Sequence, residues 1–412
     1  GAAVPVLSSR FLDRLEPRLS AFSHDTPQVA ATDDAFWAEI RAAFPKHPDY
    51  IHLESGFSSP QPAATFDAFS GYTRQINGGL SLYMRRQRAA DYAAVKAELA
   101  ALAGTTPEEI VITRNTTESL GTVIHGMDLA PGDEAIMCNQ DYGSMLEQFR
   151  QQSKRRGLKL VEVDVPLHPK SDDDVVGVYE RAITPRTKVM LVSHMINISG
   201  HILPVKKIAA MAHARGVDVI VDAAHSFAHV NFAVPDIDGD YLGASLHKWL
   251  STPLGAGLLY VRKSKIANVW PLFGETAVPA DDIRKFERLG TQPAWTMLAI
   301  RDAIRFHKMI GGARKEARLR WLQQYWTSRV RGAAPKVYLN TPDGDRACGI
   351  ANVGITGMTP AALATALFDK YKIYVVAINT GPVVGVRVTP HLFTTTADLD
   401  ALVSALTSLA RA

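Results

Sequence analysis

The most reactive side chain that this sequence suggests is a lysine in an apolar setting. Lys248 lies between two apolar runs, 241–244 and 255–261, which are both typical of buried strands. Burial removes the hydration of an ammonium group and lowers its pKa, and a neutral lysine is a nucleophile toward an aldehyde. The pattern predicts a nucleophilic amine at position 248, with an ordinary solvated loop lysine as the alternative.

A carboxylate closes another apolar run. Asp222 follows the strand-like residues 219–221, and a buried carboxylate needs a partner, such as a metal ion or a protonated ring nitrogen. Asp222 could form a metal site with His225, His229 and His247. Their spacing matches no recognised ligand pattern, and no glutamate stands beside the histidines as a base. A metal-dependent hydrolase is therefore the alternative from another chemical class.

A possible phosphate site lies where strand 110–113 runs into a helix. That helix opens with Asn115, Thr116 and Thr117, and it offers backbone amides, hydroxyl groups and the positive end of a helix dipole. The same residue types also cap ordinary helices. Ser245, together with the amine of Lys248 and the carboxylate of Asp222, favours the phosphate-binding interpretation over ordinary capping.

Pyridoxal phosphate is a cofactor that needs all of these groups together. Its phosphate needs hydroxyl and amide ligands, its aldehyde forms a Schiff base with a lysine, and its ring nitrogen stays protonated beside a carboxylate. The protonated ring then acts as an electron sink. The sequence therefore favours this cofactor over a metal ion.

As a set, these motifs resemble the class V aminotransferase family of fold-type I pyridoxal-phosphate enzymes, which includes cysteine desulfurases and isopenicillin N epimerases. The resemblance covers roughly residue 50 to the C-terminus. It implies that Lys248 forms the Schiff base, Asp222 pairs with the pyridine nitrogen and His225 bonds the ring hydroxyl. The phosphate ligands that it implies are Thr116, Thr117, Ser245 and His247.

Four further positions match the family. Asn197 matches an asparagine near the ring hydroxyl and the substrate, and Tyr142 stands where the family has an aromatic or histidine over the ring. Arg387 matches the arginine that binds the substrate α-carboxylate, a task that suits a planar guanidinium. Thr291 matches a threonine that reaches the phosphate of the neighbouring subunit, which implies a homodimer with shared active sites. Taken one at a time, three of them have an ordinary structural alternative. Tyr142 could be a core aromatic, Asn197 could cap a turn, and Arg387 could be a surface arginine on an edge strand.

The expected reaction begins at the α-carbon of an amino acid or amino-acid-derived substrate. The resemblance implies an external aldimine and removal of the α-proton by Lys248. Reprotonation then makes an epimerase or racemase, protonation on the cofactor an aminotransferase, and loss of a β substituent a lyase. The chain length, the histidine at position 225 and the tyrosine at position 142 make the sequence most similar to the isopenicillin N epimerase-like branch of the family. Residues 377–383 contain no cysteine, so desulfuration by persulfide transfer is not expected; a binding protein without turnover is a further alternative.

The substrate pocket is expected from loops 56–59 and 85–88 and from loop 273–279 of the partner subunit. Three arginines in the second loop could hold another carboxylate or could simply form a solvated helix face. They are Arg85, Arg86 and Arg88.

Composition narrows the class of protein. The chain has 412 residues, 47% hydrophobic and 21% charged, with a net charge of +4, which is the profile of a globular protein with a large core. No apolar run reaches the roughly 18 residues of a membrane span. The basic clusters are short and suit solvated helix faces, so we expect a small-molecule partner and neither nucleic acid nor membrane. Cys138 and Cys348 are expected to be buried thiols, although counting alone leaves one disulfide open.

The first residue gives an expectation about processing. The sequence begins at Gly1 without a methionine, so we interpret that glycine as a residue left after removal of an upstream segment. The expected location is the cytoplasm, or the periplasm if the removed segment was an export signal.

The elements that must position these groups alternate along the chain. Strands at 110–113, 134–138, 158–165, 188–192 and 217–221 are separated by helices at 143–156, 173–183 and 205–215. This order predicts an α/β fold with a mostly parallel sheet, in which ligands bind at the carboxyl ends of the strands. A helical region at 293–331 and strands at 336–339, 349–354, 373–377 and 385–388 predict a smaller α+β domain.

The expected fold is thus that of a fold-type I pyridoxal-phosphate enzyme. We expect residues 1–60, with one helix near 36–40, to pack on the small domain. Residues 61–292 are expected to form the large cofactor-binding domain and residues 293–412 the small C-terminal domain.

Overall fold

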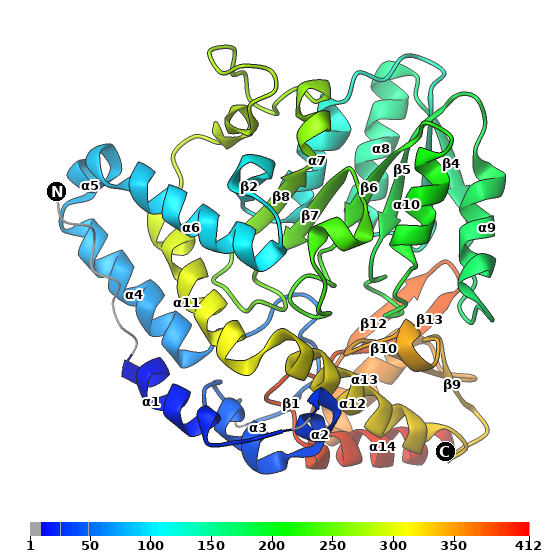
Figure 1. Cartoon of the computed structure of the whole chain (residues 1–412). Coiled ribbons are helices and arrows are strands. Elements are labelled where there is room, and N and C mark those ends of the chain that lie inside the picture. The colour runs from blue at the N-terminus through cyan, green and yellow to red at the C-terminus, as the bar shows by residue number, and fades with distance from the viewer. Residues whose placement is uncertain (1–9, 25, 48, 412) are drawn as a thin grey trace.

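The computed structural model describes residues 10–24, 26–47 and 49–411, so the interpretation of Gly1 lies outside the described residues. Its centre is a seven-stranded sheet with the order β2-β8-β7-β6-β5-β3-β4 (Figure 1). All neighbouring strands pair in parallel except β8, which is antiparallel to both β2 and β7. The strands are β2 (Ile110–Thr113), β3 (Glu134–Cys138), β4 (Lys159–Val163), β5 (Thr187–Ser193), β6 (Asp218–Asp222), β7 (Tyr241–Ser245) and β8 (Gly257–Val261).

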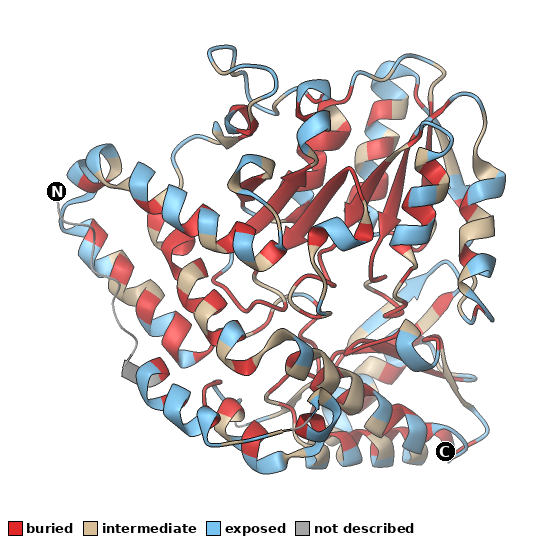
Figure 2. Cartoon of the chain, in the orientation of Figure 1, coloured by how far each residue is buried: buried red, intermediate tan, exposed pale blue. Residues whose placement is uncertain are grey.

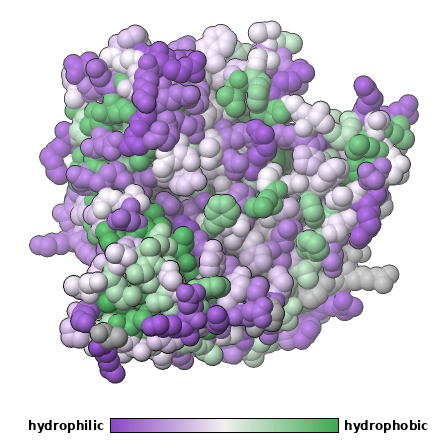
Figure 3. All heavy atoms as spheres, turned by 180° about the vertical axis from the view of Figure 1, so that it is seen from behind, coloured by the Kyte–Doolittle hydropathy of each residue, from purple (hydrophilic) through white to green (hydrophobic). Residues whose placement is uncertain are grey.

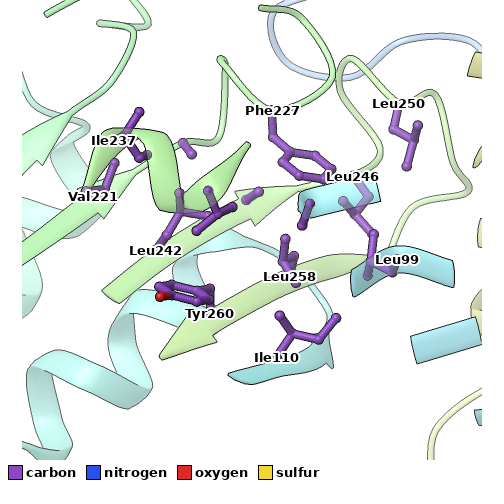
Figure 4. Packing of buried hydrophobic residues seen from close by; sticks show 14 of the residues in the cluster. Leu99, Ile110, Val221, Phe227, Ile237, Leu242, Leu246, Leu250, Leu258 and Tyr260 are labelled. Carbon is purple, nitrogen blue, oxygen red and sulfur yellow. The ribbon is translucent and has the colours of Figure 1, made fainter. Parts of the chain in front are cut away.

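Both faces of the inner strands of this sheet are buried, which explains why these strands are mostly apolar, whereas the edge strand β4 is partly exposed and contains Lys159 and Glu162. In β3, Ile136 and Cys138 contribute to one hydrophobic cluster, and Ala135 and Met137 contribute to another on the opposite face. The first cluster is covered by α4 (Ala63–Asn77), α6 (Arg88–Ala103), α9 (Asp172–Ala182), α10 (Val205–His213) and α11 (Ala294–Ile310), and the second by α7 (Thr116–Gly126) and α8 (Gly143–Arg156). Figure 2 shows the buried strands between helices whose outer faces are exposed, and Figure 4 shows part of the first cluster. The α/β prediction is confirmed.

A second, antiparallel sheet has the order β12-β13-β10-β9. Its strands are β9 (Val337–Leu339), β10 (Ala351–Ile355), β12 (Val376–Thr380) and β13 (Val383–Val388). It shares a hydrophobic cluster with α12 (Gly312–Val330), α13 (Pro360–Tyr371) and α14 (Thr396–Arg411). The strand predicted at 373–377 is divided between β11 (Ile373–Tyr374) and β12, because β11 pairs instead with β1 (Ile51–His52).

Two local predictions were incomplete. The helical region at 293–331 is two helices, α11 and α12, because Gly311 between them has φ +87, a conformation that favours glycine. The N-terminal part has three helices where one was expected: α1 (Arg10–Ser20), α2 (Pro27–Thr32) and α3 (Asp34–Arg41). Their formation depends on tertiary packing, since Leu12, Leu15 and Leu19 of α1 are buried in a cluster that includes residues of α11 and α12.

The proposed division into three segments stays a prediction. In its favour, α2 packs on α12, and β1 pairs with β11 beside the small sheet. However, α11 packs mainly against α4 and α6, which cover the large sheet.

The surface is mixed. Seen from behind, hydrophilic residues surround separate hydrophobic areas (Figure 3). Within the described ranges, no helix has both the length and the apolar character needed to cross a membrane.

Candidate active site

The candidate residues gather at one edge of the large sheet. Ser193, Asp222 and Ser245 are the last residues of β5, β6 and β7, and parallel strands bring their carboxyl ends to the same edge. Lys248 follows Ser245 in the connection between β7 and β8. The structure therefore places these groups on the edge where the sequence predicted them.

The amine of Lys248 contacts a buried histidine. Its Nζ lies 2.9 Å from Nε2 of His225 and 5.9 Å from the centre of the Tyr142 ring. Although solvent reaches part of the side chain, the surrounding protein removes most of the hydration of the amine and lowers the pKa of Lys248 to about 8; Asp222 partly opposes this shift. About a tenth of the amine is consequently neutral at pH 7, far more than in an exposed lysine.

Backbone contacts hold the lysine from both sides. The carbonyl of His247 accepts a hydrogen bond from the Ser59 amide at 3.1 Å. The carbonyl of Trp249 accepts one from Nζ of Lys315, a buried residue of α12. The peptide group before Lys248 and the one after Trp249 are thus held by segments that lie outside the large sheet.

Asp222 and His225 form the polar floor beside this amine. Oδ1 of Asp222 accepts a hydrogen bond from the Ala224 amide at 2.9 Å, and burial raises the pKa of this carboxyl group. Burial, and then the nearby Lys248, hold the pKa of His225 well below its usual value. A neutral His225 that accepts from Lys248 at Nε2 carries its proton on Nδ1, and Nδ1 is buried without a hydrogen-bond partner among the described residues.

His229 has a structural role. Its Nδ1–H donates to the carbonyl of His225 at 2.8 Å, and its Nε2 accepts from the amide of Gly349 at 2.8 Å. The ring also stacks on Trp249 with 3.6 Å between centroids. Both nitrogens are therefore engaged, so His229 cannot be a ligand of the metal site that the sequence left open. Within the described ranges, no three His, Cys, Asp or Glu side chains are placed to share a metal ion.

The predicted phosphate corner is formed at the start of α7. The hydroxyl of Ser245 accepts from the Thr116 amide at 3.0 Å and lies 2.8 Å from the Thr116 hydroxyl. Asn115 caps the helix by accepting from the Glu118 amide, so the capping role that was the alternative is real. Thr117 is exposed. Two hydroxyls at a helix N-terminus remain suited to an anion.

Arg387 lies in a buried ion pair, which the sequence did not predict. Its Nε donates to Oε2 of Glu54 at 3.3 Å, and its Nη2 donates to Oε1 of the same carboxylate. Its Nη1 donates to the backbone carbonyl of Asn197 at 3.1 Å. Sequence reasoning missed Glu54; the available signal was an acidic residue at the end of the strand-like run 50–53.

Some predicted residues lie outside this cluster. Thr291 is exposed, and among the described residues its hydroxyl bonds none of the other candidates. Arg85 and Arg86 are exposed at the end of α5 (Leu80–Arg86), and Arg88 lies over the ring of Tyr92 at 5.8 Å. Within one chain, these groups do not complete the site around Lys248.

The arrangement can therefore hold an anion at Thr116 and Ser245, a cationic group at Asp222, and a carbonyl carbon at Lys248. A carboxyl group can be bound near Arg387 and Asn197. His247, whose pKa burial lowers to about 4, is neutral and has an unpartnered Nδ1 in the described part of the chain.

Comparisons with known proteins agree with this chemistry. The sequence pattern of the family described as Aminotransferase class-V matches residues 51–402. The chain is 25% identical over 397 residues to isopenicillin N epimerase of Streptomyces clavuligerus (91% of this chain, 98% of that protein). It is 28% identical over 389 residues to a probable cysteine desulfurase of Halobacterium salinarum (87% and 91%).

The fold has close relatives of known structure. One is a mutant of the enzyme C-DES with glycine covalently linked to its PLP cofactor, which superposes with a TM-score of 0.81 at 20% identity over 89% of this chain and 98% of that chain. At this level of identity the likeness establishes the fold.

Proposed function

This chain belongs to the class V aminotransferase family, and from that premise we propose that it is a pyridoxal-phosphate enzyme that acts at the α-carbon of an amino acid or amino-acid-derived substrate. The observation that carries the proposal is the partly neutral amine of Lys248, 2.9 Å from His225 and beside the buried Asp222. A primary amine with these neighbours suits an aldehyde cofactor.

The residues fit this cofactor on structural grounds. Burial raises the pKa of the Asp222 carboxyl group, and a protonated ring nitrogen would supply a cation that favours the charged carboxylate. The unpartnered Nδ1–H of His225 is available to a ring oxygen. The Thr116 and Ser245 hydroxyls provide the phosphate corner, and Thr117 and His247 are the further ligands that we assign to it.

When bound, pyridoxal phosphate supplies an aldehyde that takes up a substrate amine and a ring that stabilises negative charge at the α-carbon. The protein supplies the proton transfer and the orientation. We assign Lys248 as the base, because its pKa of about 8 suits removal of a proton at neutral pH. His225 holds the Lys248 amine, and Tyr142, whose ring centre lies 5.9 Å from that amine, would cover one face of the cofactor.

Arg387 and Asn197 are the residues that we assign to the substrate. Arg387 would bind the α-carboxyl group, because its guanidinium reaches the same site as Lys248 and lowers the pKa of that lysine. The Asn197 side chain would lie between the cofactor hydroxyl and the substrate.

Among the possible outcomes, epimerisation or racemisation is the one that we favour. Persulfide transfer requires a mobile, reactive cysteine, whereas Cys138 and Cys348 are both buried and burial raises the pKa of each thiol to about 12. The relation to isopenicillin N epimerase supports the same choice. Amino transfer and β-elimination are the competing outcomes.

The proposed assembly is a homodimer with shared active sites. Thr291 is too exposed to serve the site of its own chain, so we propose that the partner subunit's Thr291 completes the phosphate corner. Phe57, Leu254 and Trp270 are large exposed apolar side chains that such an interface would cover. Mixed dimers of Lys248→Ala and Thr291→Val chains test this, because they should regain one intact site.

Proton exchange in heavy water distinguishes the reactions. The protein is loaded with pyridoxal phosphate and incubated with L-amino acids and short peptides, while proton NMR and the visible spectrum are recorded. Loss of the α-proton signal without a change of cofactor supports an epimerase. Conversion of the cofactor to its aminated form with release of a keto acid indicates an aminotransferase, and pyruvate with ammonia indicates a lyase.

Two variants test the residue assignments. Lys248→Ala should abolish the visible band of the covalently bound cofactor, and a band that persists removes Lys248 from its proposed role. Arg387→Ala should mainly raise KM, because it removes substrate binding and leaves the base in place. Unchanged amino-acid binding would show that the carboxyl group binds elsewhere.

A further inference from the structure

The guanidinium of Arg387 is already occupied along one edge. Nε and Nη2 donate to the two carboxylate oxygens of Glu54, and Nη1 donates to the Asn197 carbonyl. A guanidinium has five N–H donors, so two remain, one on each terminal nitrogen. These two donors are available to a carboxyl or amide group of a substrate.

The acid in this pair is held independently of the arginine. The amide of Phe57 donates to Oε1 of Glu54 at 3.1 Å, and the hydroxyl of Thr389 lies 3.4 Å from Oε2. Only 5% of Glu54 and 7% of Arg387 are exposed. A carboxylate with three N–H donors in a buried setting is a fixed part of the site, and an incoming substrate does not have to displace it.

Backbone packing fixes the arginine as well. A Cβ built on Gly56 would lie 2.6 Å from Cζ of Arg387, so the guanidinium rests directly on the peptide backbone between Glu54 and Phe57. Both members of the pair also act on the Lys248 amine, with opposite signs: Arg387 lowers its pKa and Glu54 raises it. The ion pair therefore belongs to the site of reaction.

We propose that Glu54 is a specificity-determining residue that neutralises Arg387, so that the site accepts an amide-blocked carboxyl group as well as a free carboxylate. This inference rests on the proposed function, because it concerns the substrate group that Arg387 binds. The substrate class that follows is an amino acid whose carboxyl group is free or is joined in an amide, as in a peptide.

Glu54 acts on substrate choice through its charge. A carboxylate that approaches an isolated buried arginine gains a full ionic attraction, whereas one that approaches the Arg387–Glu54 pair meets attraction and repulsion at comparable distances. The hydrogen bonds from the two remaining donors are available in both cases. An amide oxygen accepts the same hydrogen bonds without a charge, so it loses little against a carboxylate here.

The test compares two small probes that differ only in this charge, propionate and propionamide. Their dissociation constants are measured by ligand-observed NMR on the protein incubated with pyridoxal phosphate, because binding of these probes requires no turnover. For the wild type we expect the two constants to agree within about threefold. Glu54→Gln should favour propionate by about tenfold or more, since the arginine is then an unneutralised cation. Glu54→Asp keeps the charge and should retain the wild-type ratio.

A matched control variant exists in the large sheet, at the edge opposite to the one that carries Asp222 and Ser245. Glu134, at the start of β3, is also a buried carboxylate and binds Arg186 at 2.7 Å. Glu134→Gln should leave the ratio of the two constants as in the wild type, because a general loss of packing does not create charge selectivity. A Glu54→Gln ratio equal to that of the wild type, or no binding of propionate to any variant, overturns the proposal.

The wild type alone also decides the question if Glu54→Gln is not recovered folded. A wild-type preference for propionate above about tenfold would mean that Glu54 does not neutralise the arginine. The visible cofactor band is recorded on the same samples. A missing band with the expected change of ratio refutes the proposed function and leaves the role of Glu54, whereas a normal band with an unchanged ratio refutes only the role of Glu54.

Discussion

Replacing Lys248 by methionine should stabilise the cofactor-free protein, in a way that depends on pH. Burial lowers the pKa of Lys248 from 10.5 to about 8. Between these two values the unfolded chain binds more protons than the folded protein, so the stability of the wild type rises with pH in that window. Below about pH 8 the folded protein carries the full cost of the buried ammonium group, which this difference in pKa puts at about 3 kcal/mol.

Methionine keeps the length of the side chain and removes the charge. The stability advantage of Lys248→Met over the wild type should therefore be largest near pH 7 and should shrink by about 2 kcal/mol by about pH 9.5. The assay is urea unfolding of both proteins, freed of cofactor, at a series of pH values. Taking the difference between them cancels the titration of groups that they share.

The control is Lys206→Met, which changes an exposed lysine on α10. Its difference from the wild type should stay level over the same range of pH. A difference for Lys248→Met that is equally level would refute the reasoning, because it would mean that folding does not alter proton binding at Lys248.

Three further predictions concern other parts of the site. Gly56→Ala places a methyl group 2.6 Å from Cζ of Arg387 and should raise KM about tenfold or more with little loss of thermal stability; an unchanged KM would show that the guanidinium is not held there. His229→Phe leaves one buried backbone N–H and one carbonyl unpaired and should cost about 2–4 kcal/mol of stability, measured by urea unfolding. Cys138 and Cys348 should resist thiol reagents in the folded protein, since burial raises the pKa of both to about 12; rapid labelling checked by mass spectrometry would contradict this.

Local sequence patterns predicted the large sheet well. The predicted bounds of β2 and β3 agree with the structure, because each strand contains a short apolar run, 110–112 and 135–138, between polar and turn residues. The helix predicted at 143–156 ends where Gly157 adopts φ +75, which a side chain would disfavour. The positions of Asp222 and Ser245 followed from the rule that ligands bind at the carboxyl ends of parallel strands.

The ion pair between Glu54 and Arg387 could not be predicted in the same way. Glu54 and Arg387 are 333 positions apart and meet because the segment after β1 runs beside the end of β13, with a bridge from Glu54 to Thr389. The sequence around neither residue predicts a contact with the other. The family resemblance implied only that Arg387 binds the substrate α-carboxylate, whereas two of its nitrogens already donate to Glu54 within the chain.

The two anchored carbonyls beside Lys248 have a mechanical consequence. One is tethered by Ser59, from the segment that precedes α4, and the other by Lys315, from the first half of α12. The backbone around the Lys248 amine is thus hydrogen-bonded to elements outside the large sheet. A rigid-body shift of α12 against that sheet would pull on the peptide after Trp249, one residue beyond Lys248, and would change the direction of the Lys248 amine.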